Sequence, residues 1–182
     1  MAAKRELVLD AAIEVLGVAG IRALTHRAAD KAAELPEGTT SNYFRSKEGL
    51  LRGIVERLET LDRADWEALR SAPLPTSRQD AARALAEYVQ LSLGPHRSRT
   101  AARYALFLAA SSSAELREPL AAGRSAFVDL GTRMLTQLGV RDPTTASRIL
   151  TDQVDGAILH QLAMPTRDYD PRPAIERIVL AL

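Results

Sequence analysis

The sequence predicts an all-α protein of about nine helices, and three observations support this fold class. Apolar residues recur at spacings of three and four along most of the chain, which is the period of an amphipathic helix. Ser, Thr or Asp precede several of these segments, and Gly or Pro follow them, as expected of capped helices. The 182 residues are enough for one or two small domains with a buried core.

The first third of the chain predicts three short helices followed by a long one. Gly20 favours a left-handed end to the first helix, and Thr25 is a good N-cap for the second. Pro36 suits the first position of the third helix, and Ser46 caps the fourth. We therefore expect helices over residues 4–19, 25–33 and 36–43, and from 47 to about 69.

The remainder predicts five more helices separated by short breaks. Prolines and serine at 72–77 indicate a loop, and Asp142 with Pro143 forms the N-cap and first position of a helix. Three serines at 111–113 and Pro119 are expected to interrupt the chain before a long helix. The expected helices cover 78–93, 98–110, a long segment up to 138, 143–164 and 173–182.

The composition excludes several classes of protein. The chain has no cysteine, which excludes disulfides and thiolate metal sites, and no metal or cofactor is expected. No apolar run reaches the roughly 18 residues of a membrane span, and charged residues interrupt the N-terminus where a signal peptide would be apolar. We therefore expect a cytoplasmic protein. Because the net charge is only +1, any nucleic acid must meet basic groups gathered on one face.

The three short helices suit a helix-turn-helix, the unit that places its second helix in the major groove of DNA. The expected third helix is too short and polar for a core helix, and Gly38 lets the backbone approach a partner surface. Its small hydroxyl and amide side chains suit base edges, while tyrosine and lysine can hold phosphates. The candidate DNA-binding residues are Thr25, His26, Arg27, Gly38, Thr39, Thr40, Ser41, Asn42, Tyr43 and Lys47.

The run from Gly38 to Leu51 resembles the signature of the TetR family of transcriptional regulators, and Leu24 to Ala29 resembles that family's preceding helix. The resemblance covers about residues 5–60. It implies a DNA-binding domain at 1–46 and a helical domain for ligand binding and dimerisation at 47–182. It also implies a homodimeric repressor that binds a palindromic operator and is released by a small molecule. By resemblance, the DNA contacts carry over to Thr25, Arg27, Thr39, Thr40, Asn42, Tyr43 and Lys47.

Two acidic residues depart from the family's pattern. Glu34 stands where the turn usually has glycine, and a positive φ there would cost about 1–2 kcal/mol. Glu37 would repel phosphates unless it accepts a hydrogen bond from a cytosine. Two of the candidate contacts also have simpler explanations, since Thr25 can be a plain N-cap and Arg27 a surface side chain.

The C-terminal part contains aromatic and apolar side chains that could line a ligand cavity. Tyr104, Phe107 and Leu108 share one helix face and form the best cluster. A mostly apolar cavity would suit a hydrophobic effector, whereas the alternative is that these side chains only build the core. The candidate ligand-binding residues are Tyr88, Tyr104, Phe107, Leu108, Phe127, Met134 and His160.

The last two expected helices carry broad apolar stripes, and Gly156 permits close approach of another helix. Two such helices from each chain would make a four-helix dimer interface, as in the resembled family. The alternative is that both helices close the core of the monomer. The candidate interface residues are Ile149, Leu150, Val154, Ala157, Ile158, Leu162, Ile175, Ile178, Val179 and Leu182.

The hypothesis that results is a two-state switch, in which a ligand changes the spacing of two recognition helices through the long fourth helix. An activator, a ligand-independent regulator and a helical protein-interaction module remain alternatives. An enzyme is the least favoured class and no catalytic residue is expected. The chain has no His-Glu-x-x-His motif, no Glu-x-x-His pair and no glycine-rich phosphate loop.

Overall fold

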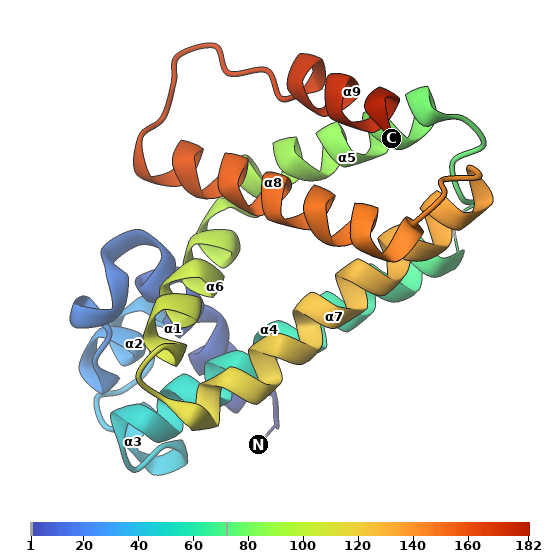
Figure 1. The fold of residues 1–182 in the computed structure, drawn as a ribbon. Helices are drawn as coiled ribbons and strands as arrows, with labels where there is room; N and C mark the ends of the chain where they lie inside the picture. Colours follow the sequence, from blue (N-terminus) through green and yellow to red (C-terminus); the bar gives the residue numbers. More distant parts are fainter. Residues whose placement is uncertain (1, 72) are drawn as a thin grey trace. The chain divides into compact units, whose positions relative to one another are not determined.

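The computed structural model describes residues 2–71 and 73–182, and this part of the chain folds into nine α-helices (Figure 1). No residue of the two described stretches lies in a strand, so the all-α prediction is confirmed. The helices are α1 (Ala2–Ala23), α2 (His26–Ala32), α3 (Thr39–Tyr43), α4 (Lys47–Ser71), α5 (Arg78–Leu93), α6 (Arg97–Ala110), α7 (Ala114–Gln137), α8 (Pro143–Ala163) and α9 (Arg172–Ala181).

Several expected helix ends agree with the structure because local capping determines them. Ser77 and Asp142 cap α5 and α8, and each side chain accepts a hydrogen bond from an amide of the first turn. The left-handed conformation expected at Gly20 is found, with a φ of 80°, but it marks a kink within α1, which continues to Ala23 and does not end at residue 19 as expected. The loop expected at 72–77 is confirmed for residues 73–77, whereas Ala72 lies outside the described residues.

Two expected boundaries are wrong. α3 begins at Thr39 rather than at Pro36, because the residue before Thr39 adopts a left-handed conformation and the segment ahead of it forms a turn. α7 continues through Pro119, which was expected to interrupt the chain. Leu116 and Leu120 are buried on either side of this proline, and their packing offsets the loss of one backbone hydrogen bond.

The chain forms two compact units, and each unit is assembled from two separate stretches of sequence. The first unit comprises Met1–Trp66 and Ser98–Gly123, and the second comprises Glu67–Arg97 and Arg124–Leu182. The first unit therefore holds α1 to α3, most of α4, nearly all of α6 and the start of α7. The boundary expected between a DNA-binding domain and a regulatory domain, at residues 46 and 47, stays a prediction. The two compact units follow packing and not this boundary, because the first unit also contains residues 98–123.

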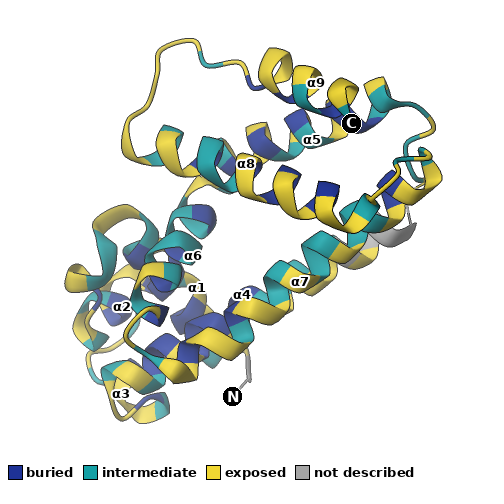
Figure 2. Ribbon diagram, in the orientation of Figure 1, coloured by how far each residue is buried: buried dark blue, intermediate teal, exposed yellow. Residues whose placement is uncertain are grey.

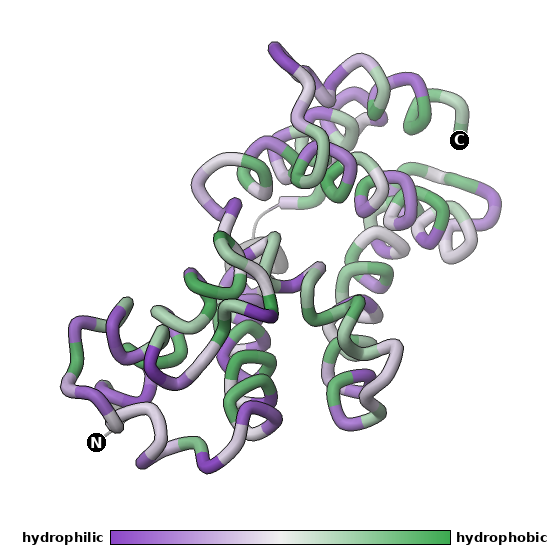
Figure 3. Tube along the Cα trace, turned by 90° about the vertical axis from the view of Figure 1, so that its left-hand side faces the viewer, coloured by the Kyte–Doolittle hydropathy of each residue, from purple (hydrophilic) through white to green (hydrophobic). Residues whose placement is uncertain are grey.

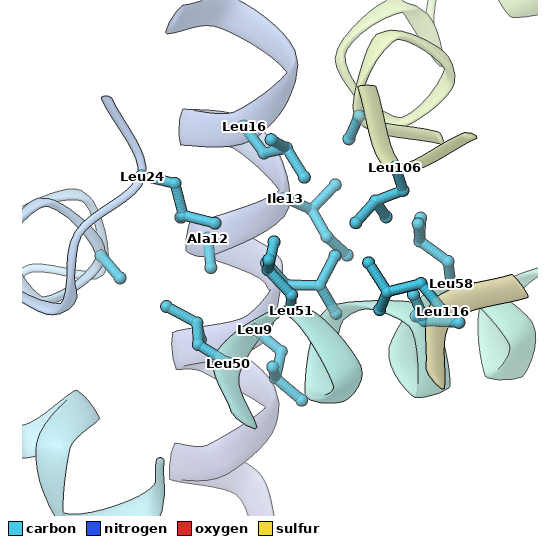
Figure 4. Packing of buried hydrophobic residues seen from close by; sticks show 14 of the residues in the cluster. Leu9, Ala12, Ile13, Leu16, Leu24, Leu50, Leu51, Leu58, Leu106 and Leu116 are labelled. Carbon is cyan, nitrogen blue, oxygen red and sulfur yellow. The ribbon is translucent and has the colours of Figure 1, made fainter. Parts of the chain in front are cut away.

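One hydrophobic core holds the first unit together (Figure 4). Hydrophobic and hydrophilic residues alternate along the helices (Figure 3), and the hydrophobic ones meet in this core. Each fully buried leucine or isoleucine contributes about 1.5–3 kcal/mol. The core residues are Val8, Leu9, Ala12, Ile13 and Leu16 of α1, Leu24, Ala29 and Phe44, Leu50, Leu51, Ile54, Val55 and Leu58 of α4, Ala102, Leu106 and Ala110 of α6, and Leu116 and Leu120 of α7.

The start of α6 lies directly against α1. A Cβ atom added to Gly17 would lie 2.0 Å from the carbonyl oxygen of Ser98, so only a residue without a side chain fits there. Further along α6, Arg103 pairs with Asp62 of α4. α6 is therefore held to both long helices of the first unit, to α1 by backbone contact and to α4 by an ion pair.

The second unit is built around α5, which packs against α8 and α9. Val89 of α5, Ile158 of α8 and Val179 of α9 are almost completely buried. Arg124, at the start of this unit's share of α7, pairs with two carboxylates of α8, Asp152 and Asp155. The predicted apolar stripes of the last two helices therefore do contribute to a core within one chain.

Two kinds of site are not found in the described part of the chain. None of its helices is both long and apolar enough to cross a bilayer. The His, Asp and Glu side chains of the two described stretches form no group of three that could hold a metal ion.

We expect Gly17→Ala to lower the free energy of unfolding by about 1–3 kcal/mol, because the new methyl group would overlap the backbone of Ser98. Chemical denaturation of the full chain measures this change. Gly123→Ala is the matched control: a Cβ atom there meets nothing within 4 Å, so helix propensity should raise stability by about 0.5–1 kcal/mol. Equal effects of the two substitutions would contradict the proposed close contact.

Candidate DNA interface

The helix-turn-helix of the first unit is formed by α2, the turn after it, and α3. Thr25 caps α2, and its hydroxyl oxygen accepts a hydrogen bond from the Ala28 amide at 3.0 Å. α2 packs on both α1 and α3. Thr25 is thus an N-cap, which is the simpler explanation, and its side chain is also exposed to solvent.

A buried carboxylate connects α2 to α3. Asp30 is 2% exposed, and its two oxygens accept hydrogen bonds from the Gly38 amide at 2.8 Å and the Thr40 amide at 2.6 Å. The Thr40 hydroxyl also donates to it at 2.5 Å. Hydrogen bonds to a charged acceptor are the stronger kind, about 1.5–3 kcal/mol each. Asp30 therefore caps the recognition helix from the neighbouring helix.

The ionised form of Asp30 is favoured in the folded chain. Burial alone would raise the pKa of this carboxyl, but the hydrogen bonds from Thr40 and Gly38 and the nearby His26 outweigh burial. The pKa of Asp30 consequently lies below the ordinary aspartate value. The three donors favour the carboxylate without a proton, because hydrogen bonds to an ionised acceptor are stronger than those to a neutral carboxyl group.

The turn between the two helices contains two residues with positive φ. Glu34 has a φ of 54°, which is the left-handed conformation expected from the family's glycine at this position. Such a conformation costs a residue with a side chain about 1–2 kcal/mol. Gly38 has a φ of 93°, and a Cβ atom there would touch nothing within 4 Å. Glycine is thus needed at 38 for its backbone angle and not, as first interpreted, only for close approach to a partner.

The outer face of α3 is polar and open to solvent. Ser41 and Asn42 are exposed, and Thr39 is partly exposed. The Thr39 hydroxyl donates to the Pro36 carbonyl at 2.6 Å, which leaves its oxygen able to accept. These three side chains are the candidate contacts that the structure presents outward together.

One candidate DNA contact is corrected by the structure, and a second makes a hydrogen bond within the chain. Thr40 is completely buried, and both its amide and its hydroxyl donate to Asp30, so it supports α3 from beneath. His26 is partly buried, and its Nε2 lies 2.8 Å from the Phe44 carbonyl oxygen. Since a carbonyl only accepts, this nitrogen carries the proton and ties the start of α2 to the end of α3.

The two candidate phosphate contacts are partly engaged within the chain. The Lys47 ammonium donates to the Ile21 carbonyl at 2.6 Å, which holds the end of α1 against the start of α4. A lysine has three N–H donors, so this bond leaves capacity for a phosphate. Tyr43 packs against the core with a partly exposed ring, whose centroid is 6.5 Å from that of Phe44.

The acidic residue of concern, Glu37, lies opposite Arg27. Their side chains are both mostly exposed, and the nearest nitrogen and oxygen are 3.6 Å apart. An exposed pair of this kind contributes about 0–1 kcal/mol. Glu37 therefore partly neutralises the charge of Arg27. The sequence analysis did not consider that these two residues pair with each other.

Sequence reasoning missed Asp30, although the sequence contains a signal for it. With His26, Ala29 and Ala33 it lies on one face of α2, and that face packs inward. A lone carboxylate on a mostly apolar helix face must find donors when it is buried. Those donors come from Gly38 and Thr40, eight and ten positions further along the chain, at the start of the next helix.

The candidate ligand-binding residues are divided between the two units. Tyr104, Phe107 and Leu108 lie on α6 in the first unit, and Leu108 is 73% exposed. In the second unit, the rings of Tyr88 of α5 and Phe127 of α7 form a tilted pair, with centroids 5.1 Å and planes 39° apart. The remaining two, Met134 and His160, lie in the same unit as Tyr88 and Phe127, buried and exposed respectively.

Half of the candidate dimer residues are buried within the chain. α8 and α9 each have a buried and an exposed side (Figure 2). The buried candidates belong to the core of the second unit, which is the alternative considered from the sequence. They are Leu150, Val154, Ile158, Ile175 and Val179; Ile149 is exposed, and Ala157, Leu162, Ile178 and Leu182 are partly exposed.

The chain matches two models of one protein family. Residues 8–54 match the model described as bacterial regulatory proteins, tetR family. Residues 76–182 match a tetracyclin repressor-like C-terminal domain. The chain belongs to the TetR family. This TetR-family member is therefore a DNA-binding regulator of transcription, in a family of regulators rather than enzymes, and the polar face of α3 belongs to its DNA-binding domain.

Several solved structures share the fold of this chain. A family member from Streptomyces coelicolor, SCO1917, is 28% identical with a TM-score of 0.70, covering 97% of this chain and 96% of that one. The multidrug binding protein EbrR in complex with proflavin is 28% identical with a TM-score of 0.63, covering 98% and 99%. A regulator from Saccharomonospora viridis in complex with choline shares only the fold, at 14% identity and a TM-score of 0.79, covering 100% and 95%. None of the curated protein sequences compared with the chain matches it.

We expect Asp30→Asn to lower the free energy of unfolding by about 2–3 kcal/mol at neutral pH, because an amide has one acceptor oxygen for three donors. The folded pKa of Asp30 lies below its unfolded value, so its contribution is complete above about pH 4 and is lost as the pH falls through the folded pKa. The difference between wild type and variant should therefore shrink below about pH 4.

Denaturant unfolding at a series of pH values measures both effects. Asp129→Asn, a change at an exposed aspartate of α7, is the control and should alter stability by less than about 0.5 kcal/mol. A pH-independent difference for Asp30→Asn would show that the carboxylate's charge does not hold α3.

Proposed function

We propose that the protein is a repressor that binds a palindromic operator as a homodimer and is released by a small molecule. The observation that carries the proposal is the outward polar face of α3, held by a carboxylate buried behind it. Thr39, Ser41 and Asn42 would meet base edges, and Tyr43 and Lys47 would meet phosphates. A regulator of bacterial genes acts where its DNA is, so we place it in the cytoplasm.

Homodimerisation is supported by apolar side chains that remain exposed on α8 and α9. Ile149 and Leu159 of α8 are 48% and 42% exposed, and Leu180 of α9 is 42% exposed. A Cβ atom added to Gly156 of α8 would have no neighbour within 4 Å, so a second helix could approach closely there. One short recognition helix reads few base pairs, and two copies related by symmetry double the sequence that is read.

A small-molecule effector is supported by the likeness to EbrR, whose structures contain proflavin and ethidium. Both compounds are flat aromatic molecules, and they would suit an aromatic pair such as Tyr88 and Phe127. In the same unit, Thr132 has a buried hydroxyl without a hydrogen-bond partner, the kind of group that a ligand or a water satisfies. We propose that this unit holds the effector and that α4 transmits its binding.

Selection of bound sequences from random duplexes tests the DNA part of the proposal. We expect the full chain to recover a palindrome whose half-sites are about one helical turn apart. Asn42→Ala should relax the preference at one position of each half-site and cost about 1–3 kcal/mol. Arg148→Ala, an exposed change on α8, is the control. Recovery of no common sequence would contradict a role in specific regulation.

Fluorescence titration of the chain with proflavin, without DNA because the dye intercalates, tests the effector class. We expect saturable binding that weakens when Phe127→Ala removes one ring of the aromatic pair. Tyr169→Ala, in the segment between α8 and α9, is the control for loss of an aromatic residue that is not a candidate ligand contact. If wild type does not bind the dye, or if both variants weaken binding equally, an effector site at the aromatic pair is wrong.

A further inference from the structure

A cleft of about 380 Å³ lies beside the end of α3, between α1, the turn after α3 and α4. Three arginines, Arg5, Arg45 and Arg52, border it together with Glu56, and Phe44 contributes to its lining. We call it the arginine cleft. None of its three arginines was a candidate contact from the sequence, because they come from separate elements 40 and seven residues apart.

The shape of the cleft depends on two glycines. Gly49 and Gly53 lie one turn apart on α4 and line the cleft. A Cβ atom at Gly53 would lie 2.5 Å from the Phe44 ring, so the ring packs directly against the helix backbone there. A side chain at Gly53 would displace the Phe44 ring, whereas one at Gly49 would extend into the open part of the cleft.

The charge of the cleft is positive, and its internal pairs are weak. The Arg5 guanidinium lies 5.3 Å from the centroid of the Phe44 ring and pairs with Glu56 at 2.9 Å. Arg52 pairs with Glu115 at 3.4 Å, and both side chains are more than half exposed. Arg45 is exposed and makes no ion pair with any described residue. An anion could therefore replace the carboxylates at little cost.

The arginine cleft is continuous with the candidate DNA interface. Tyr43, a candidate phosphate contact, is at once the last residue of α3 and part of the cleft lining. Ser46, which caps α4 and accepts a hydrogen bond from the Gly49 amide at 3.0 Å, also lines it. Arginine forks match the oxygens of a phosphate better than any other side chain.

We propose that the arginine cleft binds a backbone phosphate of duplex DNA next to the bases that α3 reads, with Arg45 and Arg52 as its donors. The inference rests on the proposed DNA-binding role of α3 and extends the contact surface onto α4. Glu56 opposes this contact, because its carboxylate faces the same space. The phosphate contact carries no sequence information and fixes how the protein lies on the duplex.

The test measures how the affinity of the full chain for DNA depends on salt. Two duplexes are used: the one recovered by selection, and a scrambled duplex of the same composition. For Arg45→Gln and for Arg52→Gln we expect affinity to fall about fivefold to tenfold on both duplexes. The slope of log affinity against log salt should also decrease by about 1. Glu56→Gln should act in the opposite direction and raise affinity on both.

Arg63→Gln is the matched control, because it removes the same charge from an exposed position on the same helix, three turns beyond Arg52. Thermal melts monitored by circular dichroism confirm that each variant is folded. Unchanged affinity and salt slope for both cleft variants would overturn the inference, and so would a loss confined to the selected duplex. Inorganic phosphate that binds free protein through these arginines, with DNA affinity unchanged, would also overturn it.

Failure of the cleft and failure of the proposed function give different results. If selection returns no common sequence, specific regulation fails, and a duplex of arbitrary sequence still reports whether the cleft holds phosphates. If selection succeeds and the cleft variants behave as wild type, only the cleft inference fails.

Discussion

The DNA-binding unit depends on one buried carboxylate. α3 has only five residues, too few to be stable as a helix without support from its surroundings. Asp30 supplies that support, because it accepts hydrogen bonds from two amides and one hydroxyl at the start of the helix. Without Asp30 these donors would lack a partner. The orientation of α3 relative to α2 is thereby set by hydrogen-bond geometry as well as by apolar packing.

This arrangement separates support from recognition within a few residues. Thr40 is buried and donates to Asp30, while its neighbour Thr39 is partly exposed and its neighbour Ser41 is exposed. Similar division occurs at the ends of the motif, where His26 and Lys47 use polar atoms to hold backbone carbonyls. Several polar side chains of the motif thus stabilise the reading surface from behind, and only part of the polar sequence is available to a partner.

The sequence predicted the fold class and most helix ends well, because these are determined locally. Caps such as Asp142 and the kink at Gly20 follow from the conformations that single residues prefer. The start of α3 was misplaced because it depends on a carboxylate nine residues earlier in the chain. Tertiary packing also decides which polar residues of the motif face inward and which face outward. It likewise divides the apolar stripe of α8 between core and surface, and no local pattern encodes either division.

The discontinuity of both units has a consequence for how the chain is made. A ribosome that has released only the helix-turn-helix and α4 has not yet supplied Leu106, Leu116 or Leu120, which complete the core around them. The core of the DNA-binding unit is therefore incomplete until the chain has grown past residue 120. At that stage α5 has been made, but α8 and α9, against which it packs, have not. Nascent chains will expose apolar helix faces for much of synthesis, and an N-terminal fragment would retain that exposed face permanently.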